Sequence, residues 1–172
     1  MLRFTAMFGL VCLAASGQVI ASGQVIKDQP LPLPDGANQR ADAAVQFLSP
    51  DMINIPARRA AQIDLHFRVA DGLHINSHAP TDKTLIPTRL AVVEVQGLNV
   101  TAVDFPPGTQ YAPQFAPREK LSVYAGEFVL HAHLTAQPGE HLLEGGLRYQ
   151  ACDANACLPP RTIPVSVTVV AQ

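Results

Sequence analysis

The stretch Gln62-Ile63-Asp64-Leu65-His66-Phe67-Arg68-Val69 alternates polar and apolar residues without interruption. A period of two is typical of a β-strand with one buried face. Phe128 to Thr135 and Ile163 to Val169 show the same alternation, and Leu90 to Val95 and Val100 to Phe105 are shorter apolar runs. No segment has a convincing amphipathic helical period. These patterns predict an all-β fold of about seven short strands, arranged as a β-sandwich in a single domain.

Pro164 interrupts the last alternating stretch at an outward-facing position. Proline cannot donate a backbone hydrogen bond, so it is confined to edge strands or to the first residues of a strand. We therefore expect Pro164 to lie in an edge strand or among the first residues of a strand.

The composition excludes several classes of protein. The chain has 172 residues, with 12 basic and 14 acidic side chains, and we find no basic cluster, so a nucleic-acid partner is not expected. There is no serine in a nucleophile-elbow context, no glycine-rich phosphate loop and no motif that pairs two carboxylates, so hydrolytic activity has no support. No cofactor is expected.

The N-terminal residues are typical of export. Arg3 precedes an apolar run from Phe4 to Ala15, and small residues follow, so residues 1–23 are predicted to be a secretory signal peptide. A retained membrane anchor and lipidation of Cys12 are the alternatives. Residues 24–44 carry Pro30, Pro32 and Pro34 and are predicted to be a flexible spacer. The domain is then expected over residues 45–172, with no stable membrane insertion after the signal is removed.

A long segment from Pro106 to Lys120 contains four prolines and one glycine, together with Tyr111 and Phe115. Loops of this length are uncommon in a compact domain and tend to be functional. We therefore expect this loop to take part in the activity.

Two cysteines are separated by four intervening residues in the sequence Arg148-Tyr149-Gln150-Ala151-Cys152-Asp153-Ala154-Asn155-Ala156-Cys157-Leu158-Pro159-Pro160. They can close a small ring, either as a structural disulfide or as a redox pair. A ring of about six residues constrains the unfolded chain by only about 2 kcal/mol, against about 4.7 kcal/mol for a loop of about 100 residues. The same short ring lets one cysteine resolve a mixed disulfide formed at the other. Zinc would need further ligands, and there is no second cysteine pair.

These residues resemble a known family. Tyr149 to Cys152 and then Cys157 to Pro160 are similar to the signature of the N-terminal periplasmic domain of the DsbD-type thiol:disulfide interchange family. Asp71 to Ser77, Leu85 to Thr88 and Val123 to Glu127 resemble further segments of that domain. The resemblance covers about Gln46 to Val170. It implies an immunoglobulin-like β-sandwich with both cysteines on a hairpin and a mobile loop covering them.

The resemblance also implies an activity. It implies a thiol-disulfide oxidoreductase of the protein-disulfide reductase type, which shuttles electrons through a reversible Cys152–Cys157 disulfide in the periplasm. The partners implied are thioredoxin-like periplasmic proteins and a membrane electron transporter. Since the chain carries neither the family's membrane-spanning domain nor its C-terminal thioredoxin-like domain, we expect the partners to be separate proteins. The alternative is a non-catalytic immunoglobulin-like binding module with a purely structural hairpin disulfide.

Site residues follow from the same resemblance. Cys157 would exchange with partners and Cys152 would resolve, with Tyr149 supporting the site within the cysteine motif. The cap loop would map near Phe115 to Lys120, with Phe115 shielding the disulfide. His74 and Asn76 stand at positions where well-known members carry two supporting aromatic residues, and the cysteine spacing is one residue shorter than in those members. His74 is expected beside the cysteines, where it could lower a thiol pKa or accept a hydrogen bond.

Other histidines are interpreted as surface residues. His131 and His133 are two apart, so they share one face of a strand and could bind a metal. Neither has a third ligand at a recognisable spacing, so we expect solvent-facing strand histidines and no metal site.

Overall fold

The computed structural model describes residues 44–113 and 118–172. Every regular element in these residues is a β-strand, and no helix able to cross a bilayer occurs among them. The strands are β1 (Val45–Phe47), β2 (Met52–Ile55), β3 (Ala61–Val69), β4 (His74–Asn76), β5 (Arg89–Val92), β6 (Leu98–Asp104), β7 (Thr109–Tyr111), β8 (Leu121–Tyr124), β9 (Glu127–Ala136), β10 (Gly139–Tyr149), β11 (Ala151–Cys152) and β12 (Arg161–Ala171). The predicted signal peptide and nearly all of the predicted spacer lie outside the described residues.

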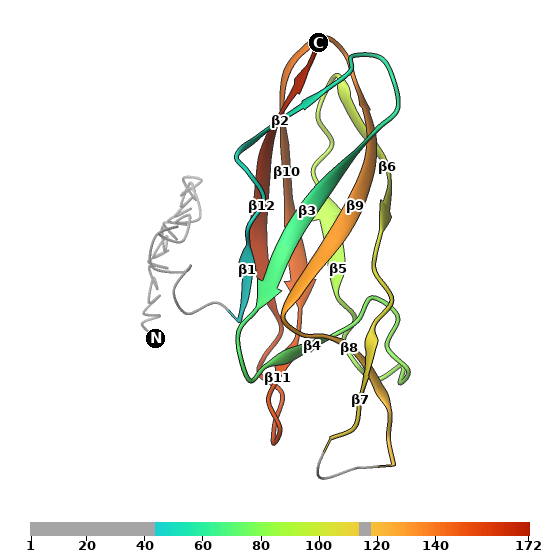
Figure 1. The fold of residues 1–172 in the computed structure, drawn as a ribbon, viewed down its shortest axis with the longest axis vertical. Helices are drawn as coiled ribbons and strands as arrows, with labels where there is room; N and C mark the ends of the chain where they lie inside the picture. Colours follow the sequence, from blue (N-terminus) through green and yellow to red (C-terminus); the bar gives the residue numbers. More distant parts are fainter. Residues whose placement is uncertain (1–43, 114–117) are drawn as a thin grey trace, which may run out of the picture. The chain divides into compact units, whose positions relative to one another are not determined.

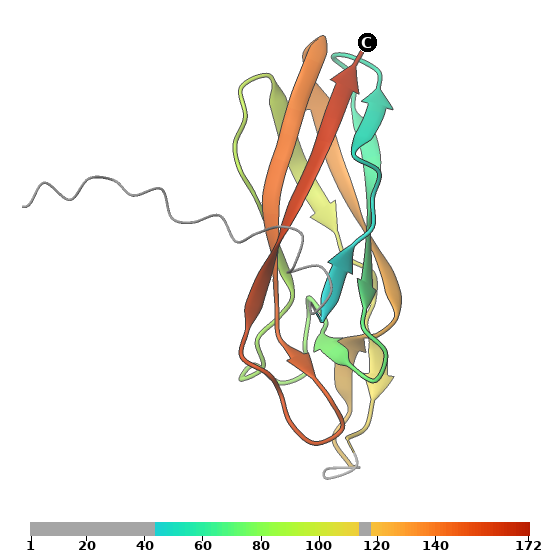
Figure 2. The same cartoon turned by 90° about the vertical axis from the view of Figure 1, so that its left-hand side faces the viewer.

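Two four-stranded sheets form the sandwich, with strand orders β1-β3-β9-β6 and β2-β12-β10-β5. Figures 1 and 2 show the two sheets facing each other, with β3 and β9 in one layer and β10 and β12 in the other. All neighbours are antiparallel except β2 and β12, which run parallel. The predicted all-β, immunoglobulin-like sandwich is therefore confirmed.

The core lies between these sheets because one face of each long strand is apolar. In β3 the exposure alternates along the whole strand, and Ile63, Leu65, Phe67 and Val69 are buried. The facing positions of β9, β10 and β12 supply Leu130, Leu134, Leu143, Leu147, Val165, Val167 and Val169. Burying each large side chain is worth about 1.5–3 kcal/mol, so this alternation is the main source of stability.

Pro164 lies opposite Gly146 of β10, and β2 pairs with β12 only from Thr168 to Ala171. At Pro164, β12 therefore has a ladder partner on one side only. The expectation of an edge strand or a strand start was wrong, because β12 lies between β2 and β10 and Pro164 is its fourth residue. A residue without an N–H group is tolerated there because β12 has one open side at this position.

A third sheet, with the order β11-β4-β8-β7, lies beyond one end of the sandwich, at the lower end in Figure 1. A row of aromatic rings joins it to the core. The ring centroids of Phe47 and Phe67 are 5.2 Å apart, those of Phe67 and Phe128 are 5.2 Å apart, and those of Phe128 and Tyr124 are 4.9 Å apart. Tyr124 belongs to β8, so this row holds the third sheet against the sandwich.

The expected long loop from Pro106 to Lys120 is only partly a loop. Thr109, Gln110 and Tyr111 form β7, which pairs antiparallel with β8. Gly108, just before β7, is required by a close approach, because a Cβ atom there would lie 2.2 Å from the Ser122 hydroxyl oxygen. The prediction of a continuous loop was wrong because three residues give no detectable period, and the pairing partner comes from outside the segment.

Candidate functional site

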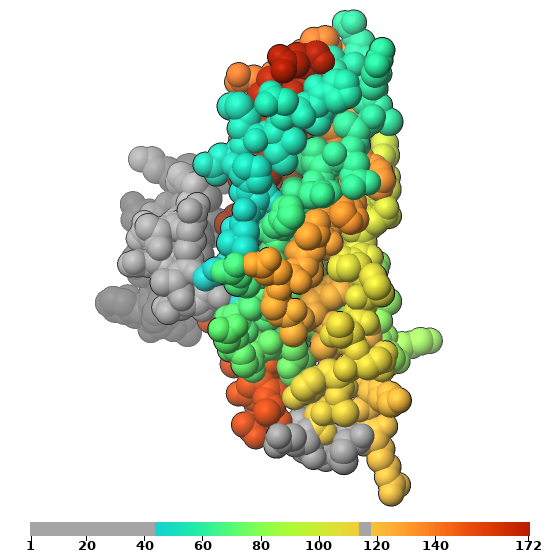
Figure 3. Space-filling model, viewed as in Figure 1, coloured from blue at the N-terminus to red at the C-terminus, as the bar shows by residue number. Residues whose placement is uncertain are grey.

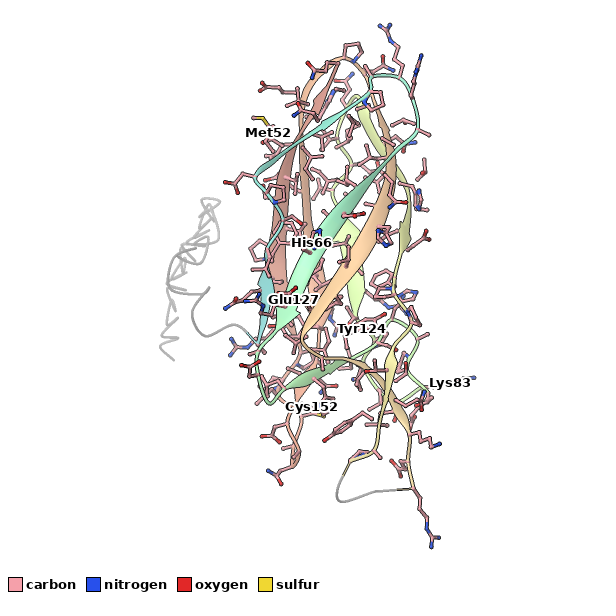
Figure 4. All side chains as sticks on the ribbon, viewed as in Figure 1. Met52, His66, Lys83, Tyr124, Glu127 and Cys152 are labelled. Carbon is pink, nitrogen blue, oxygen red and sulfur yellow. A yellow bond between two sulfur atoms is a disulfide. The ribbon has the colours of Figure 1, made fainter. Side chains whose placement is uncertain are left out.

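Cys152 and Cys157 form a disulfide at the tip of the connection between β10 and β12. Cys152 ends β11 and is 4% exposed, whereas Cys157 is exposed. Figure 4 shows Cys152 at the lower end of the sandwich, far from Met52, and Figure 3 shows the orange atoms of this connection reaching solvent there. One sulfur thus belongs to a buried strand residue and the other to a surface residue.

Backbone and side-chain hydrogen bonds fix the short turn between the cysteines. The Asp153 carboxylate accepts hydrogen bonds from the backbone N–H groups of Asn155 and Ala156, both at 2.7 Å. These bonds lower the pKa of Asp153, so its carboxylate is ionised at neutral pH. Two backbone bonds close the hairpin, from Asp153 N–H to the Ala156 carbonyl (2.9 Å) and from Leu158 N–H to the Ala151 carbonyl (2.8 Å). The turn therefore presents Cys157 outward in one conformation.

His74 lies directly opposite Cys152, because β4 and β11 pair with His74 and Cys152 in register. Residues directly opposite on antiparallel strands point to the same face, with Cβ atoms about 4.5–5.5 Å apart. The imidazole is 7% exposed and packs on the ring of Tyr111 from β7, with centroids 4.2 Å apart. The structure therefore brings His74 beside the cysteine pair, as expected.

Burial lowers the pKa of His74, and the nearby Asp153 carboxylate partly opposes this shift. The unfolded chain then binds a proton at this imidazole more readily than the folded one does. Stability should therefore fall as the pH drops below about 6.5, the ordinary histidine pKa, and continue to fall down to the folded-state pKa. Urea midpoints at pH 7.5 and 5.5 should differ more for the wild type than for His74→Asn. Equal differences in the two proteins would contradict this prediction.

Asn76 is 1% exposed and lies two residues from His74 on β4. Its side-chain amide N–H donates a hydrogen bond to the Ile86 backbone carbonyl (3.1 Å). The backbone carbonyl of Asn76 accepts a hydrogen bond from the buried Thr88 hydroxyl (2.6 Å). Both bonds tie the segment that follows β4 back onto the strand. Asn76 therefore holds the backbone that carries His74.

Tyr149 is 1% exposed, at the end of β10. Among the described residues its hydroxyl has no hydrogen-bond partner. The Val45 amide lies near the hydroxyl, but outside hydrogen-bond geometry. Burial raises the pKa of Tyr149, so the side chain is neutral and acts as packing beneath the hairpin. Phe115 lies outside the described residues, so its shielding role stays a prediction.

Tyr111 and Asp153 are the site residues that sequence reasoning did not assign. Tyr111 was visible only as one of the aromatic residues in a proline-rich segment, and nothing local indicates that β7 brings it to His74. Asp153 had a local signal, because Asp and Asn side chains commonly accept hydrogen bonds from backbone N–H groups two residues further on.

His131 and His133 face solvent on β9, as expected, and each has an aspartate partner. The ring of His131 lies 2.7 Å from Asp64, and that of His133 lies 2.8 Å from Asp104. In residues 44–113 and 118–172, no group of three or more His, Cys, Asp or Glu side chains is arranged to hold a metal ion.

The sequence model of the family "Thiol:disulfide interchange protein DsbD, N-terminal" matches residues 44–168, which include the whole site. The chain belongs to this family. Membership in the DsbD N-terminal family carries the general activity of thiol:disulfide interchange, and the structure supplies the disulfide on which such an activity acts. No curated protein sequence matches the chain significantly.

Solved structures of related domains are similar at low identity. The DsbD N-terminal domain of Neisseria meningitidis in its reduced form is 19% identical, with a TM-score of 0.42 over 61% of this chain and 74% of that chain. The N-terminal periplasmic domain of ScsB from Proteus mirabilis is 14% identical, with a TM-score of 0.46 over 72% of this chain and 43% of that chain. A complex between the DsbD N-terminal and PilB N-terminal domains of N. meningitidis contains a chain that is 21% identical, with a TM-score of 0.40 over 61% of this chain and 73% of that chain. The family assignment rests on the sequence match.

Proposed function

We propose that this protein is a periplasmic thiol:disulfide interchange module, which shuttles electrons between thioredoxin-like or membrane redox partners through the Cys152–Cys157 disulfide. The observation that carries the proposal is the unequal exposure of the two cysteines within one short ring, in a member of the DsbD N-terminal family. An incoming thiolate can reach Cys157 and cannot readily reach Cys152.

Exchange then proceeds in two balanced steps. A partner thiolate attacks the Cys157 sulfur, a mixed disulfide forms, and Cys152 leaves as a thiolate that takes up a proton. The other cysteine thiolate of the same partner then attacks the partner sulfur that is bonded to Cys157. This step closes a disulfide within the partner, so Cys157 is left reduced and the partner is oxidised. Two electrons have moved to this protein, and the reverse sequence passes them to an oxidised partner. The overall activity is that of a thiol-disulfide oxidoreductase.

A structural role for the disulfide has less support. The eleven paired positions of β10 and β12, from Gly139–Ala171 to Tyr149–Arg161, already hold the two ends of the connection together. A ring of about six residues adds only about 2 kcal/mol. The bond joins segments that would be neighbours without it.

Export to the periplasm is part of the proposal. It is supported by the signal-like residues 1–23 and by the family match. Disulfides form and persist in such oxidising compartments, and a thiol carrier needs reductant delivered to it there.

The reduction potential tests the proposal against the alternative of a binding module. Equilibration with a thiol redox buffer should give a potential above about −300 mV, and reduced thioredoxin should reduce the disulfide in the folded domain. Mass spectrometry after alkylation measures the fraction reduced, and circular dichroism checks that the fold persists. A potential far below −300 mV, together with no reaction with thioredoxin, would identify a structural disulfide.

A further inference from the structure

Arg148 and Arg89 lie directly opposite each other on neighbouring strands, β10 and β5. The flanking residues Leu147 and Leu90 pack into the core, so both arginines point outward from the sheet, and both are exposed. Like charges directly opposite on antiparallel strands are destabilising. The fold thus retains an arrangement that costs stability.

No carboxylate in the part of the chain that the structure describes neutralises these arginines. Among the described residues, neither Arg148 nor Arg89 has a carboxylate at salt-bridge distance, and neither has Arg161 at the start of β12. In the other sheet, Arg68 of β3 lies directly opposite Glu127 of β9 and forms an ion pair with it. An outward arginine there has a carboxylate partner, in contrast to Arg148 and Arg89. Arg161 lies opposite the buried Tyr149 and therefore starts from the other face of the sheet. We call Arg89 and Arg148 the arginine patch.

The arginine patch lies next to the connection between β10 and β12, residues 150–160, which carries both cysteines and is called the hairpin below. Arg148 precedes Cys152 by four residues of extended chain. Four residues of strand span about 13 Å at most, so the patch is within reach of any protein bound at Cys157. The hairpin itself carries one carboxylate, Asp153, against the two positive charges of the patch.

We propose that the arginine patch is the docking surface for an acidic surface on the thiol-bearing redox partner, and that it steers the partner's cysteine to Cys157. The inference rests on the proposed function and adds the charge of the partner. Complementary charge beside a reactive atom raises the rate of productive encounter and favours partners of one sign. The uncompensated arginine pair is then retained because an acidic partner neutralises it during exchange.

The expected size of the effect follows from Coulomb's law. Two unit charges about 13 Å apart in water change a rate by about 1.7-fold without screening. Screening reduces this factor to about 1.4-fold at 10 mM ionic strength and to about 1.1-fold at 0.15 M. Arg148→Glu changes the local charge by two units, so it should alter the encounter with one partner carboxylate about two-fold at 10 mM. Arg89→Glu with Arg148→Glu should alter it about four-fold.

The experiment uses two synthetic peptides that are identical except for one residue beside a single cysteine, aspartate in one and asparagine in the other. Their rates of attack on the oxidised protein are measured by stopped alkylation at 10 mM and 0.15 M ionic strength. The aspartate-to-asparagine rate ratio should fall about two-fold in Arg148→Glu and about four-fold in the double variant at 10 mM, and by less than about two-fold in both at 0.15 M. Differences in peptide thiol pKa cancel when the ratio is compared between variants.

Stability provides a second readout of opposite sign. Arg148→Glu places a carboxylate opposite Arg89, so the melting temperature of this variant should rise by about 1–5 °C. Its aspartate-to-asparagine rate ratio should fall at the same time. The double variant restores a like-charged pair and should melt near the wild type. Arg59→Glu, in the exposed loop after β2, makes the same change in net charge and should leave the ratio unchanged.

The outcomes separate this inference from the proposed function. If the aspartate-to-asparagine rate ratio is the same in the wild type and in both variants, the proposed docking surface is overturned. The exchange activity is unaffected by that result, because the disulfide still reacts with both peptides. A fall in the ratio that Arg59→Glu reproduces also overturns it, because net charge alone would be responsible. A disulfide that reacts with neither peptide overturns the proposed function, and the docking surface with it.

Discussion

Replacing Cys152 with Ala should trap this protein in a stable mixed disulfide with thioredoxin-type proteins. Cys157 is exposed and remains able to exchange, but the only thiol placed to attack the mixed disulfide from within the domain is gone. Incubation of Cys152→Ala with a thioredoxin variant that keeps only its exposed cysteine, activated as a mixed disulfide with a small aromatic thiol, should release the small thiol and give a covalent 1:1 adduct on a non-reducing gel. Mass spectrometry should locate the bond at Cys157. Multiple-turnover transfer of electrons should be abolished.

Cys157→Ala is the matched control. Its remaining cysteine is only 4% exposed and lies beside the buried His74, so little adduct should form. Comparable trapping by the two variants would show that the roles of the cysteines are assigned wrongly. Absence of adduct from both would favour the binding module with a structural disulfide.

Phe67→Ala should lower the free energy of unfolding by about 3–5 kcal/mol. The Phe67 ring is fully buried and packs between those of Phe47 and Phe128, so its removal leaves a cavity that the rigid strands cannot close. That loss is a large part of the 5–15 kcal/mol that stabilises a typical domain. Urea unfolding followed by circular dichroism measures it.

Leu48→Ala removes a side chain of related type that is 43% exposed, and it should change stability by less than about 1 kcal/mol. A similar small loss for Phe67→Ala would show that the aromatic row contributes little to the core. Because that row continues through Phe128 to Tyr124 of the third sheet, Phe67→Ala should also make the disulfide more accessible to thioredoxin as the sheet loosens.

The long strands were predictable because their signal is local. In β3, β9 and β12, alternate residues must face the core and solvent, so the pattern of burial is written directly in the order of the residues. Pro164 was predictable only in part, since β2 pairs with β12 over Thr168 to Ala171 alone, and this open side depends on where a distant strand ends.

The short strands were not predictable in this way. β4, β7 and β11 have two or three residues each, too few to show a period, and they are strands only because partners elsewhere in the chain pair with them. The third sheet, which carries the site, is built from these elements. For this reason the sequence indicated the cysteines and His74, but did not indicate Tyr111 as the ring that covers His74.

By itself, the order of residues determined the β class, the small ring that two cysteines can close, and the resemblance to the DsbD N-terminal family. Only the tertiary structure decided that Cys152 is buried while Cys157 is exposed, and that Arg148 faces Arg89 with no carboxylate partner among residues 44–113 and 118–172. Alternation and ring size depend on neighbours in sequence, whereas exposure and cross-strand pairing depend on the register between distant strands. That register is set when whole apolar faces are buried together, which no single segment specifies.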